Sequence, residues 1–244
     1  NINSYFQNTI KNMKNNTGIK LSNIESIQLY SKMYLNAFEN CEIYSNWEIW
    51  GNVYKYISDS HDFITERFKK NNIWALTFDI FHYIYSNPWT LSLKNKKILI
   101  ISSFVESIEK KIANRKHIYG IDLFPECEFI FSKPPQTQGL NESEEFHIEF
   151  EKYTKKIDSI INDFDIALVS CGGYGNLVCN YIYEKGKSAI YVGGVLQMYF
   201  GILGGRWIKE RPDIVKLYKN EYWSSPSENE RPKNYKNIES SCYW

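Results

Sequence analysis

Two glycine-rich segments in the C-terminal third have the residue types that bind phosphate. The first is Cys171–Gly175 (CGGYG), the second is the pair Gly193-Gly194, and each directly follows a short apolar run. A helical pattern over Asn176–Lys185 separates them, so the stretch is typical of a β-Gly-α-β-Gly unit. Such a unit turns backbone N–H groups and a helix N-terminus toward an anion. The segments therefore predict a ligand that carries phosphate, most simply a nucleotide or a nucleotide-sugar.

The familiar nucleotide motifs are absent around these glycines. The pattern GxGxxG lacks its third glycine, and no acidic residue ends the strand that follows, which argues against a dehydrogenase. GxxxxGK[ST] is absent as well, which argues against a P-loop NTPase. A second interpretation stays open, in which the glycines only make tight strand–helix turns.

Apolar runs alternate with helical patterns in the second half of the chain, which predicts a parallel sheet flanked by helices, an α/β Rossmann-like fold. The expected strands are Lys97–Ser102, Glu128–Phe131, Ile166–Ser170 and Ser188–Val192. The expected helices are Phe104–Asn114, Ser143–Asn162 and Asn176–Lys185, with a loop at Lys133–Leu140. We expect one domain over 1–244, with a Rossmann-like core at 87–210.

The remaining parts of the chain are expected to flank that core. Residues 1–86 form a helical, aromatic part, with helices over 1–40 and His61–Lys70, strands at Glu42–Trp50 and Ile73–Leu76, and a capping box at Ser22 and Glu25. The aromatic cluster between Trp74 and Trp89 is interpreted as core, with an acceptor platform or a dimer face as alternatives. Residues 211–244 contain three prolines and are expected to be an irregular tail.

Ligands of open parallel sheets bind outside the carboxyl ends of the strands, and this rule selects the candidate residues. Backbone amides of the glycines would bind the diphosphate, Lys133 would offset its charge, and Tyr174 would stack on a base or sugar. Glu106 is the candidate base, with an exposed carboxylate in a first helical turn as the alternative. Arg206 and Trp207 would clamp phosphate and sugar, or else pack the tail on the sheet. The predicted ligand-binding residues are Gly172, Gly173, Tyr174, Gly175, Gly193, Gly194, Gln197, Lys133 and Gln136.

The spacing of the acidic pairs and of the histidines does not predict a metal site. Asp163-Phe164-Asp165 has the Asp-x-Asp form of many sugar transferases, but it precedes its strand and is interpreted as a solvated turn. The four histidines and five cysteines show no metal-ligand spacing. The formal net charge of +1 gives no support to nucleic-acid binding, and no apolar run is long enough to span a bilayer. These features favour a cytoplasmic protein, or one of the host cytoplasm if it is viral.

The chain resembles the GT-D-type glycosyltransferase-like domains of polysaccharide-synthesis gene clusters and some large viruses. The blocks that carry the resemblance are Asn87–Lys94, Lys97–Ile108, Asp163–Gly175, Gly186–Trp207 and the closing Cys242-Tyr243-Trp244. The resemblance implies a Rossmann-like sheet, a nucleotide-sugar donor such as a UDP-sugar, a glycan acceptor, and a divalent metal, Mn²⁺ or Mg²⁺. In that family an Asp-x-Glu motif near the first strand holds the metal. No such motif precedes Gly18, so the metal ligands are left unassigned. Either the N-terminal strand is missing from the sequence, or the protein has lost the motif.

Three functions follow from these observations. The first is a glycosyltransferase that moves a sugar from a nucleotide-diphosphate sugar to a hydroxyl acceptor. The second is a non-catalytic module that binds a nucleotide-sugar or glycan, which the missing acidic motif favours. The third is a nucleotide-dependent oxidoreductase, which only the Rossmann-like pattern favours.

Overall fold

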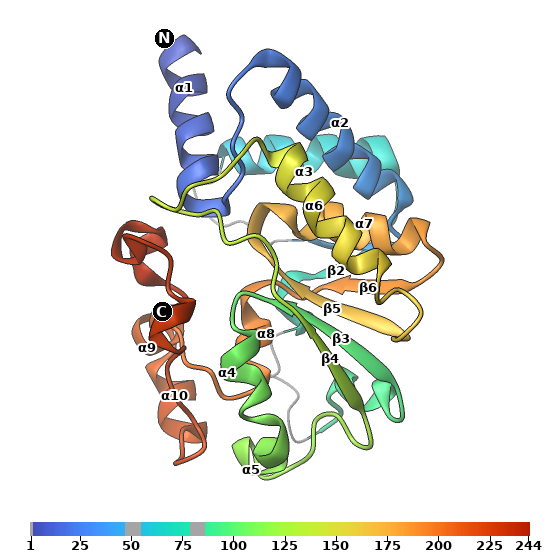
Figure 1. The fold of residues 1–244 in the computed structure, drawn as a ribbon, viewed down its shortest axis with the longest axis vertical. Helices are drawn as coiled ribbons and strands as arrows, with labels where there is room; N and C mark the ends of the chain where they lie inside the picture. The colour runs from blue at the N-terminus through green and yellow to red at the C-terminus, as the bar shows by residue number, and fades with distance from the viewer. Residues whose placement is uncertain (1, 47–54, 79–85) are drawn as a thin grey trace.

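A four-stranded parallel sheet forms the centre of the computed structural model, which describes residues 2–46, 55–78 and 86–244 (Figure 1). Its strand order is β4-β3-β5-β6, with every neighbouring pair parallel. The strands are β3 (Lys97–Ser102), β4 (Glu128–Ser132), β5 (Ile166–Ser170) and β6 (Ser188–Tyr191). The chain passes from β3 outward to β4 and then returns to the other side of β3 for β5. The order therefore reverses between β3 and β5, and this switch point is where such sheets bind ligands.

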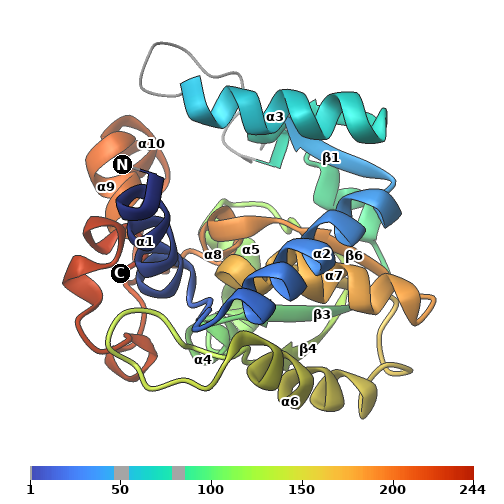
Figure 2. The same cartoon turned by 90° about the horizontal axis from the view of Figure 1, so that it is seen from above.

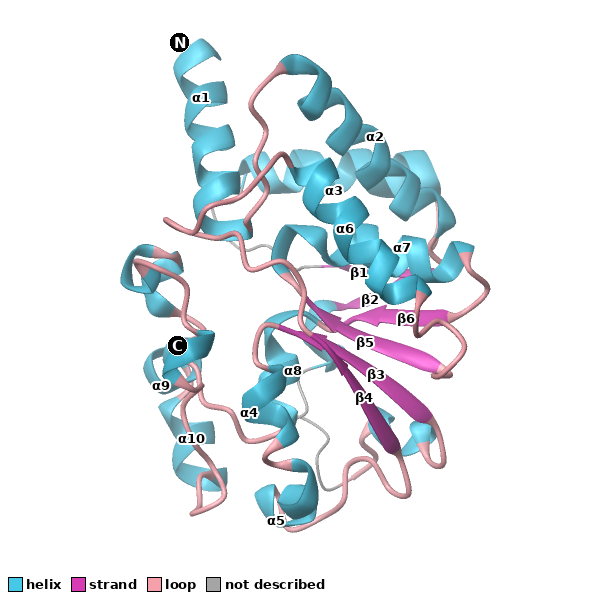
Figure 3. Ribbon diagram, viewed as in Figure 1, coloured by secondary structure: helices cyan, strands magenta, loops and turns pink. Residues whose placement is uncertain are grey.

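Strand β3 is buried on both faces because helices cover both sides of the sheet (Figure 3). Leu99 and Ile101 point to one face, which α2 (Ile24–Asn40), α6 (Phe146–Asp158) and α7 (Gly175–Glu184) cover. Ile98 and Ile100 point to the other face, toward α4 (Val105–Glu109), α5 (Arg115–Ile118) and α8 (Leu196–Tyr199). Because successive side chains of a strand point to opposite faces, β3 contributes to two separate cores. The first core lies on the face of α2, α6 and α7, and the second core lies on the face of α4, α5 and α8.

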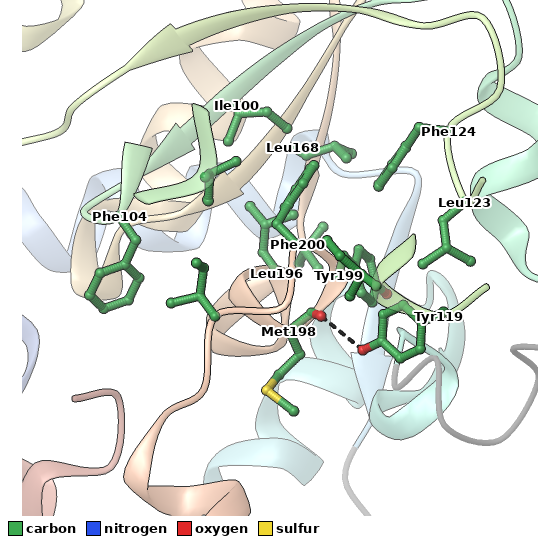
Figure 4. Packing of buried hydrophobic residues seen from close by; sticks show 14 of the residues in the cluster. Ile100, Phe104, Tyr119, Leu123, Phe124, Leu168, Leu196, Met198, Tyr199 and Phe200 are labelled. Atoms are coloured by element: carbon green, nitrogen blue, oxygen red, sulfur yellow. Dashed lines mark hydrogen bonds between the residues drawn. The ribbon is translucent and has the colours of Figure 1, made fainter. Parts of the chain in front are cut away.

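The second core combines aliphatic side chains with several stacked aromatic rings. Phe124 stacks on Phe200 with ring centroids 5.3 Å apart, next to Ile100 and Leu168 of the sheet (Figure 4). The Tyr119 hydroxyl donates to the Met198 carbonyl at 2.8 Å, so the polar tip of this buried ring is paired. This packing fixes α8 and the segment that follows it beneath the sheet.

The N-terminal part adds a second small sheet. Helix α1 (Ile2–Asn12) continues into a π-helical turn, Met13–Thr17, that Gly18 ends with a left-handed φ of 79°. Strands β1 (Ile43–Asn46) and β2 (Asn71–Trp74) pair in parallel, and α3 (Lys55–Phe68) lies between them in the sequence. The prediction of a strand at Glu42–Trp50 holds for β1, and the rest of that range lies outside the described residues.

Several predicted boundaries are wrong. The capping box is formed by Asn23 and Ser26, because Ser22 instead bonds Glu145 of the neighbouring segment. Strand β2 and helix α3 both begin before their predicted starts, and a 3-10 turn replaces the end of the predicted strand. The helices α4 and α6 are shorter than expected. Of the aromatic cluster, Phe78 and Trp89 pack on the second core, and residues 79–85 lie outside the described residues.

The tail, 211–244, contains more regular structure than predicted. Helix α9 (Gly205–Glu210) ends the predicted core, and the tail then forms helix α10 (Pro212–Tyr218), in which Pro212 is the first residue. Short 3-10 turns then lead to Trp244. Figures 1 and 2 show that this tail and α1 lie on the same side of the molecule, beside the carboxyl ends of the strands. In the described part of the chain, no helix is long and apolar enough to cross a membrane.

Candidate functional site

A cavity of about 410 Å³ lies at the carboxyl edge of the sheet, on the switch point. The ends of three strands form its floor: Ser103 and Phe104 follow β3, Ser170–Gly173 close β5, and Gly193-Gly194 follow β6. The π-helical turn and α2 form one wall, and the last residues of the tail form another. The location matches the crevice that the sequence predicts, and the volume lies in the range of small-molecule sites.

The turn after β5 is shaped by its packing partners. A Cβ atom at Gly173 would lie 2.4 Å from Ile19 Cγ1 and 2.8 Å from Thr17 Oγ1, so glycine lets the N-terminal segment approach. The hydroxyl of Tyr30 donates to the Gly173 carbonyl and that of Tyr191 to the Gly172 carbonyl, both at 2.9 Å. With those carbonyls held by tyrosines, the turn is fixed in front of the N-terminus of α7.

The other predicted glycines have different roles. A Cβ at Gly175 would meet the Tyr191 ring at 2.2 Å, and Gly175 does not line the cavity in the described part of the chain. A Cβ at Gly194 would meet the Tyr243 ring, also at 2.2 Å. Gly193 has a φ of +72° and open space where a side chain would project, and it lines the cavity. The glycines make close turns, and four of the five, Gly172, Gly173, Gly193 and Gly194, also line the cavity. Phosphate binding by these glycines stays a prediction.

Aromatic side chains supply much of the cavity wall. Phe104 contacts Trp244 edge-on at 6.1 Å between centroids, and Tyr243 packs against the same indole at 5.8 Å. Burial raises the pKa values of Tyr30, Tyr191 and Tyr243 above their usual range, so their hydroxyls are neutral hydrogen-bonding groups at neutral pH. The aromatic residues of the lining are Tyr30, Tyr34, Phe104, Tyr191, Tyr243 and Trp244.

Two predicted ligand contacts are wrong because their side chains belong to the core. Tyr174 is 1% exposed and packs in the first core, so its ring cannot stack on a ligand. Gln197 is also 1% exposed, and its Nε2 donates to the carbonyls of Ile202 at 3.0 Å and Tyr243 at 3.3 Å. Gln197 therefore holds the tail against α8 and does not reach a sugar.

Lys133, Gln136 and Glu106 are corrected as well, since none of them is among the described residues that line the cavity. Lys133 Nζ pairs with Glu106 Oε1 at 3.0 Å, and Asn229 of the tail donates to the other oxygen of the same carboxylate. The hydrogen bonds from Lys133 and Asn229 lower the pKa of Glu106, which makes it a weaker base. Gln136 donates to the Glu230 carbonyl. These side chains dock the tail on the sheet.

Carboxylates are scarce in the cavity. Glu239 is the one Asp or Glu among the described lining residues; its Oε2 accepts from Arg206 Nη2 at 3.3 Å and from the Cys242 thiol at 3.1 Å. Across the described residues, no group of three or more His, Cys, Asp or Glu side chains could hold a metal ion. These residues do not fit the expected Mn²⁺ or Mg²⁺, so we derive no step through a metal.

The remaining acidic and basic candidates are structural. Asp163-Phe164-Asp165 is a turn at the amino end of β5, as predicted, where Asp165 Oδ2 accepts from the Lys97 amide at 2.8 Å. Arg206 lies over the Tyr243 ring at 5.0 Å, and Trp207 is buried in the second core. Of the two alternatives for Arg206 and Trp207, the structure shows the one in which they pack the tail.

Sequence reasoning missed part of the cavity walls. Asn16 and Thr17 come from the π-helical turn, Asn176 from α7, and Gln138 from the loop after β4. The carboxyl-end rule does select Gln138, which follows a predicted strand, and Asn176 directly follows the predicted glycine turn. Asn16 and Thr17 reach the site through packing between distant segments, which leaves no local pattern. Comparison with known protein families, with curated proteins and with solved structures found no match for this chain.

Proposed function

We propose that this chain is a glycosyltransferase that binds a nucleoside-diphosphate sugar in the carboxyl-edge cavity. The observation that carries the proposal is the position of the cavity: it lies at the switch point of a parallel sheet, with the glycine turn before α7 on its floor. Helix N-termini and glycine turns stabilise phosphate by their N–H groups.

The cavity lining supports a nucleotide more than a free anion. None of the described lining residues is Lys or Arg, so backbone amides and the dipole of α7 would have to stabilise the diphosphate. The aromatic wall of Phe104, Tyr243 and Trp244 offers apolar surface for a base or sugar ring. The proposal therefore places phosphates at the Gly172-Gly173 turn and a ring against the tail.

In this proposal Glu239 replaces Glu106 as the candidate base, because it is the one carboxylate among the described residues that line the cavity. In the proposed reaction an acceptor hydroxyl attacks the anomeric carbon of the donor. The bond from that carbon to the diphosphate oxygen breaks, the diphosphate leaves with the electron pair, and the hydroxyl proton passes to Glu239. Glu239→Gln is expected to lower turnover by 10²-fold or more while nucleotide affinity stays unchanged. Equal turnover of Glu239→Gln and wild type would remove Glu239 from the mechanism.

The binding site is tested with two matched glycine variants. Gly193 and Gly186 both have positive φ and open space around a new Cβ, but Gly186 does not line the cavity in the described structure. Asparagine tolerates the left-handed region, so Gly193→Asn and Gly186→Asn should both fold. We expect Gly193→Asn to weaken UDP-glucose binding at least tenfold by calorimetry, and Gly186→Asn to leave it unchanged. Equal affinities in all three proteins would contradict the site.

A non-catalytic nucleotide-sugar-binding module is the second candidate. The observation that favours it is that Glu239, the single carboxylate of the described lining, is already bonded to Arg206. Thermal-shift screening against nucleotide sugars, with and without Mn²⁺ and with NAD⁺ included, separates the candidates when it is followed by a turnover assay. Binding without turnover at any metal concentration would support the module. A shift with NAD⁺ alone would support an oxidoreductase.

A further inference from the structure

Gln138 is the polar side chain of the cavity with the clearest unmet hydrogen-bonding need. It is 8% exposed, it lines the cavity, and its Oε1 is buried with no hydrogen-bond partner. A buried carbonyl oxygen without a partner is unfavourable, so such a group calls for an explanation.

Gly18 and Gly172 flank the Gln138 carboxamide. A Cβ at Gly18 would lie 3.4 Å from Gln138 Cδ, and a Cβ at Gly172 would lie 3.4 Å from Gln138 Nε2. Both glycines have positive φ, +79° and +54°, and Gly172 lines the cavity beside Gln138. The absence of Cβ atoms at these glycines leaves room for the carboxamide between them, and its nitrogen lies next to the glycine turn.

The loop that carries Gln138 is held by the π-helical turn. Lys14 Nζ donates to the carbonyls of Thr137 at 2.5 Å, Gly139 at 3.4 Å and Asn141 at 3.0 Å. The Gly139 amide donates back to the Asn15 carbonyl at 3.0 Å, and Thr137 Oγ1 donates to the Gly18 carbonyl at 2.6 Å. Gln138 is thus fixed on both sides along the chain, which is how a binding group is preorganised.

The carboxamide nitrogen is the part of Gln138 that suits an anion. The oxygen is closed to solvent, whereas the nitrogen lies beside Gly172, where the proposed function places the diphosphate. An amide N–H is a donor and a phosphate oxygen is an acceptor, so the pair is complementary without a charged side chain. We propose that Gln138 binds the ligand diphosphate by donating a hydrogen bond from Nε2 at the Gly172 turn. This inference rests on the proposed function.

The test uses two substitutions at Gln138 that differ in charge. Gln138→Met keeps the length of the side chain and removes its hydrogen bonds, and we expect it to weaken UDP and UDP-glucose binding about three- to tenfold. Gln138→Glu replaces the donor by a charge that repels phosphate, so its loss should be larger than that of Gln138→Met. Uridine, which lacks phosphate, should bind all three proteins equally. Gln28→Met is the control, because Gln28 is exposed, lies outside the described cavity lining and should leave every affinity unchanged.

Each other outcome has a meaning. Equal binding of UDP by wild type and Gln138→Met would overturn this inference and leave the proposed function standing. Gln138→Glu binding UDP as tightly as wild type would show that no phosphate lies beside this side chain, which also overturns it. If UDP-glucose does not bind but inorganic pyrophosphate does, and Gln138→Glu abolishes that binding, the anion site stands and the nucleotide-sugar proposal fails. If neither UDP-glucose nor inorganic pyrophosphate binds, the inference on Gln138 and the proposed function are both overturned.

A second readout needs no ligand. Because Gln138 Oε1 is unpaired in the free protein, Gln138→Met should raise the Tm, whereas Gln136→Met loses a hydrogen bond and should lower it. A fall in Tm for Gln138→Met would mean that Gln138 supports the fold, and the inference would be overturned.

Discussion

At the scale of single residues, glycines that look alike in the sequence are needed for different reasons. Gly173 is glycine because Ile19 and Thr17 pack onto its Cα, whereas Gly193 is glycine because its backbone is left-handed. A side chain at Gly173 would disturb the packing of the fold, whereas a side chain at Gly193 would project into open space in the cavity. A loss of binding on substitution is therefore informative at Gly193 and ambiguous at Gly173.

Gly173→Ala is expected to destabilise the protein by about 1–3 kcal/mol, because the added methyl would overlap Ile19 Cγ1 and the segment must shift. Urea unfolding measures this as a lower midpoint with an unchanged slope. An unchanged midpoint would mean that the N-terminal segment does not pack on the turn as described.

At the scale of elements, the tail is attached through a buried carboxylate. Glu230 is 0% exposed, and it accepts hydrogen bonds from the Ser107 amide at 3.0 Å, the Ser227 amide at 3.1 Å and the Ser107 hydroxyl. It thus caps the start of a 3-10 turn in the tail and joins that turn to α4. Since Tyr243 and Trp244 follow on the same tail, the attachment also positions one wall of the cavity.

Glu230→Ala is expected to destabilise the tail by about 2 kcal/mol, because it leaves the Ser107 amide without an acceptor. The Ser227 amide and the Ser107 hydroxyl lose one bond each and keep the bonds between the two serines. Amide hydrogen exchange should show lost protection across 227–244 and little change in the sheet. Glu228→Ala is the matched control, since Glu228 lies two residues away and is exposed. Equal protection in Glu230→Ala and wild type would contradict the assigned attachment.

At the scale of the whole molecule, many ionisable groups are buried in neutral form. Burial raises the pKa values of several tyrosines and thiols above their ordinary values of 10.0 and 9.0. They are Tyr30, Tyr153, Tyr174, Tyr191, Tyr243, Cys171 and Cys179. Lys14 and Lys111 shift the other way, because burial lowers their pKa values, but they are two groups against these seven.

Stability should therefore fall at alkaline pH. Above about pH 9 the unfolded chain loses protons from these groups while the folded chain keeps them, so the folded state binds more protons and each group costs about 1.4 kcal/mol per pH unit. The stabilising contribution is complete below the ordinary values and is lost as pH rises toward the raised ones. Urea midpoints at neutral and alkaline pH measure the effect. A midpoint that stays constant up to pH 10 would contradict the burial of these side chains.

The sheet could be predicted from the sequence because each strand carries its own signal. Lys97–Ser102 and Ile166–Ser170 were predicted with their observed bounds, since doubly buried strands are continuous apolar runs. The cavity was predicted in position but only in part in composition. Tyr174 and Gln197 face the core, and Lys133 and Glu106 pair with each other, because side-chain direction and tail docking depend on contacts between distant segments. No local pattern encodes those contacts.

One consequence of this construction concerns the order in which the protein acquires its properties. The two walls of the cavity are joined by a hydrogen bond from Asn15 to the Asn237 carbonyl, across a sequence separation of 222. A ribosome releases residue 237 long after β3 to β6 can pair, and closing so long a loop is slow compared with local structure. The cavity is therefore completed after the sheet in the growing chain, and refolding should restore the sheet before it joins the two cavity walls.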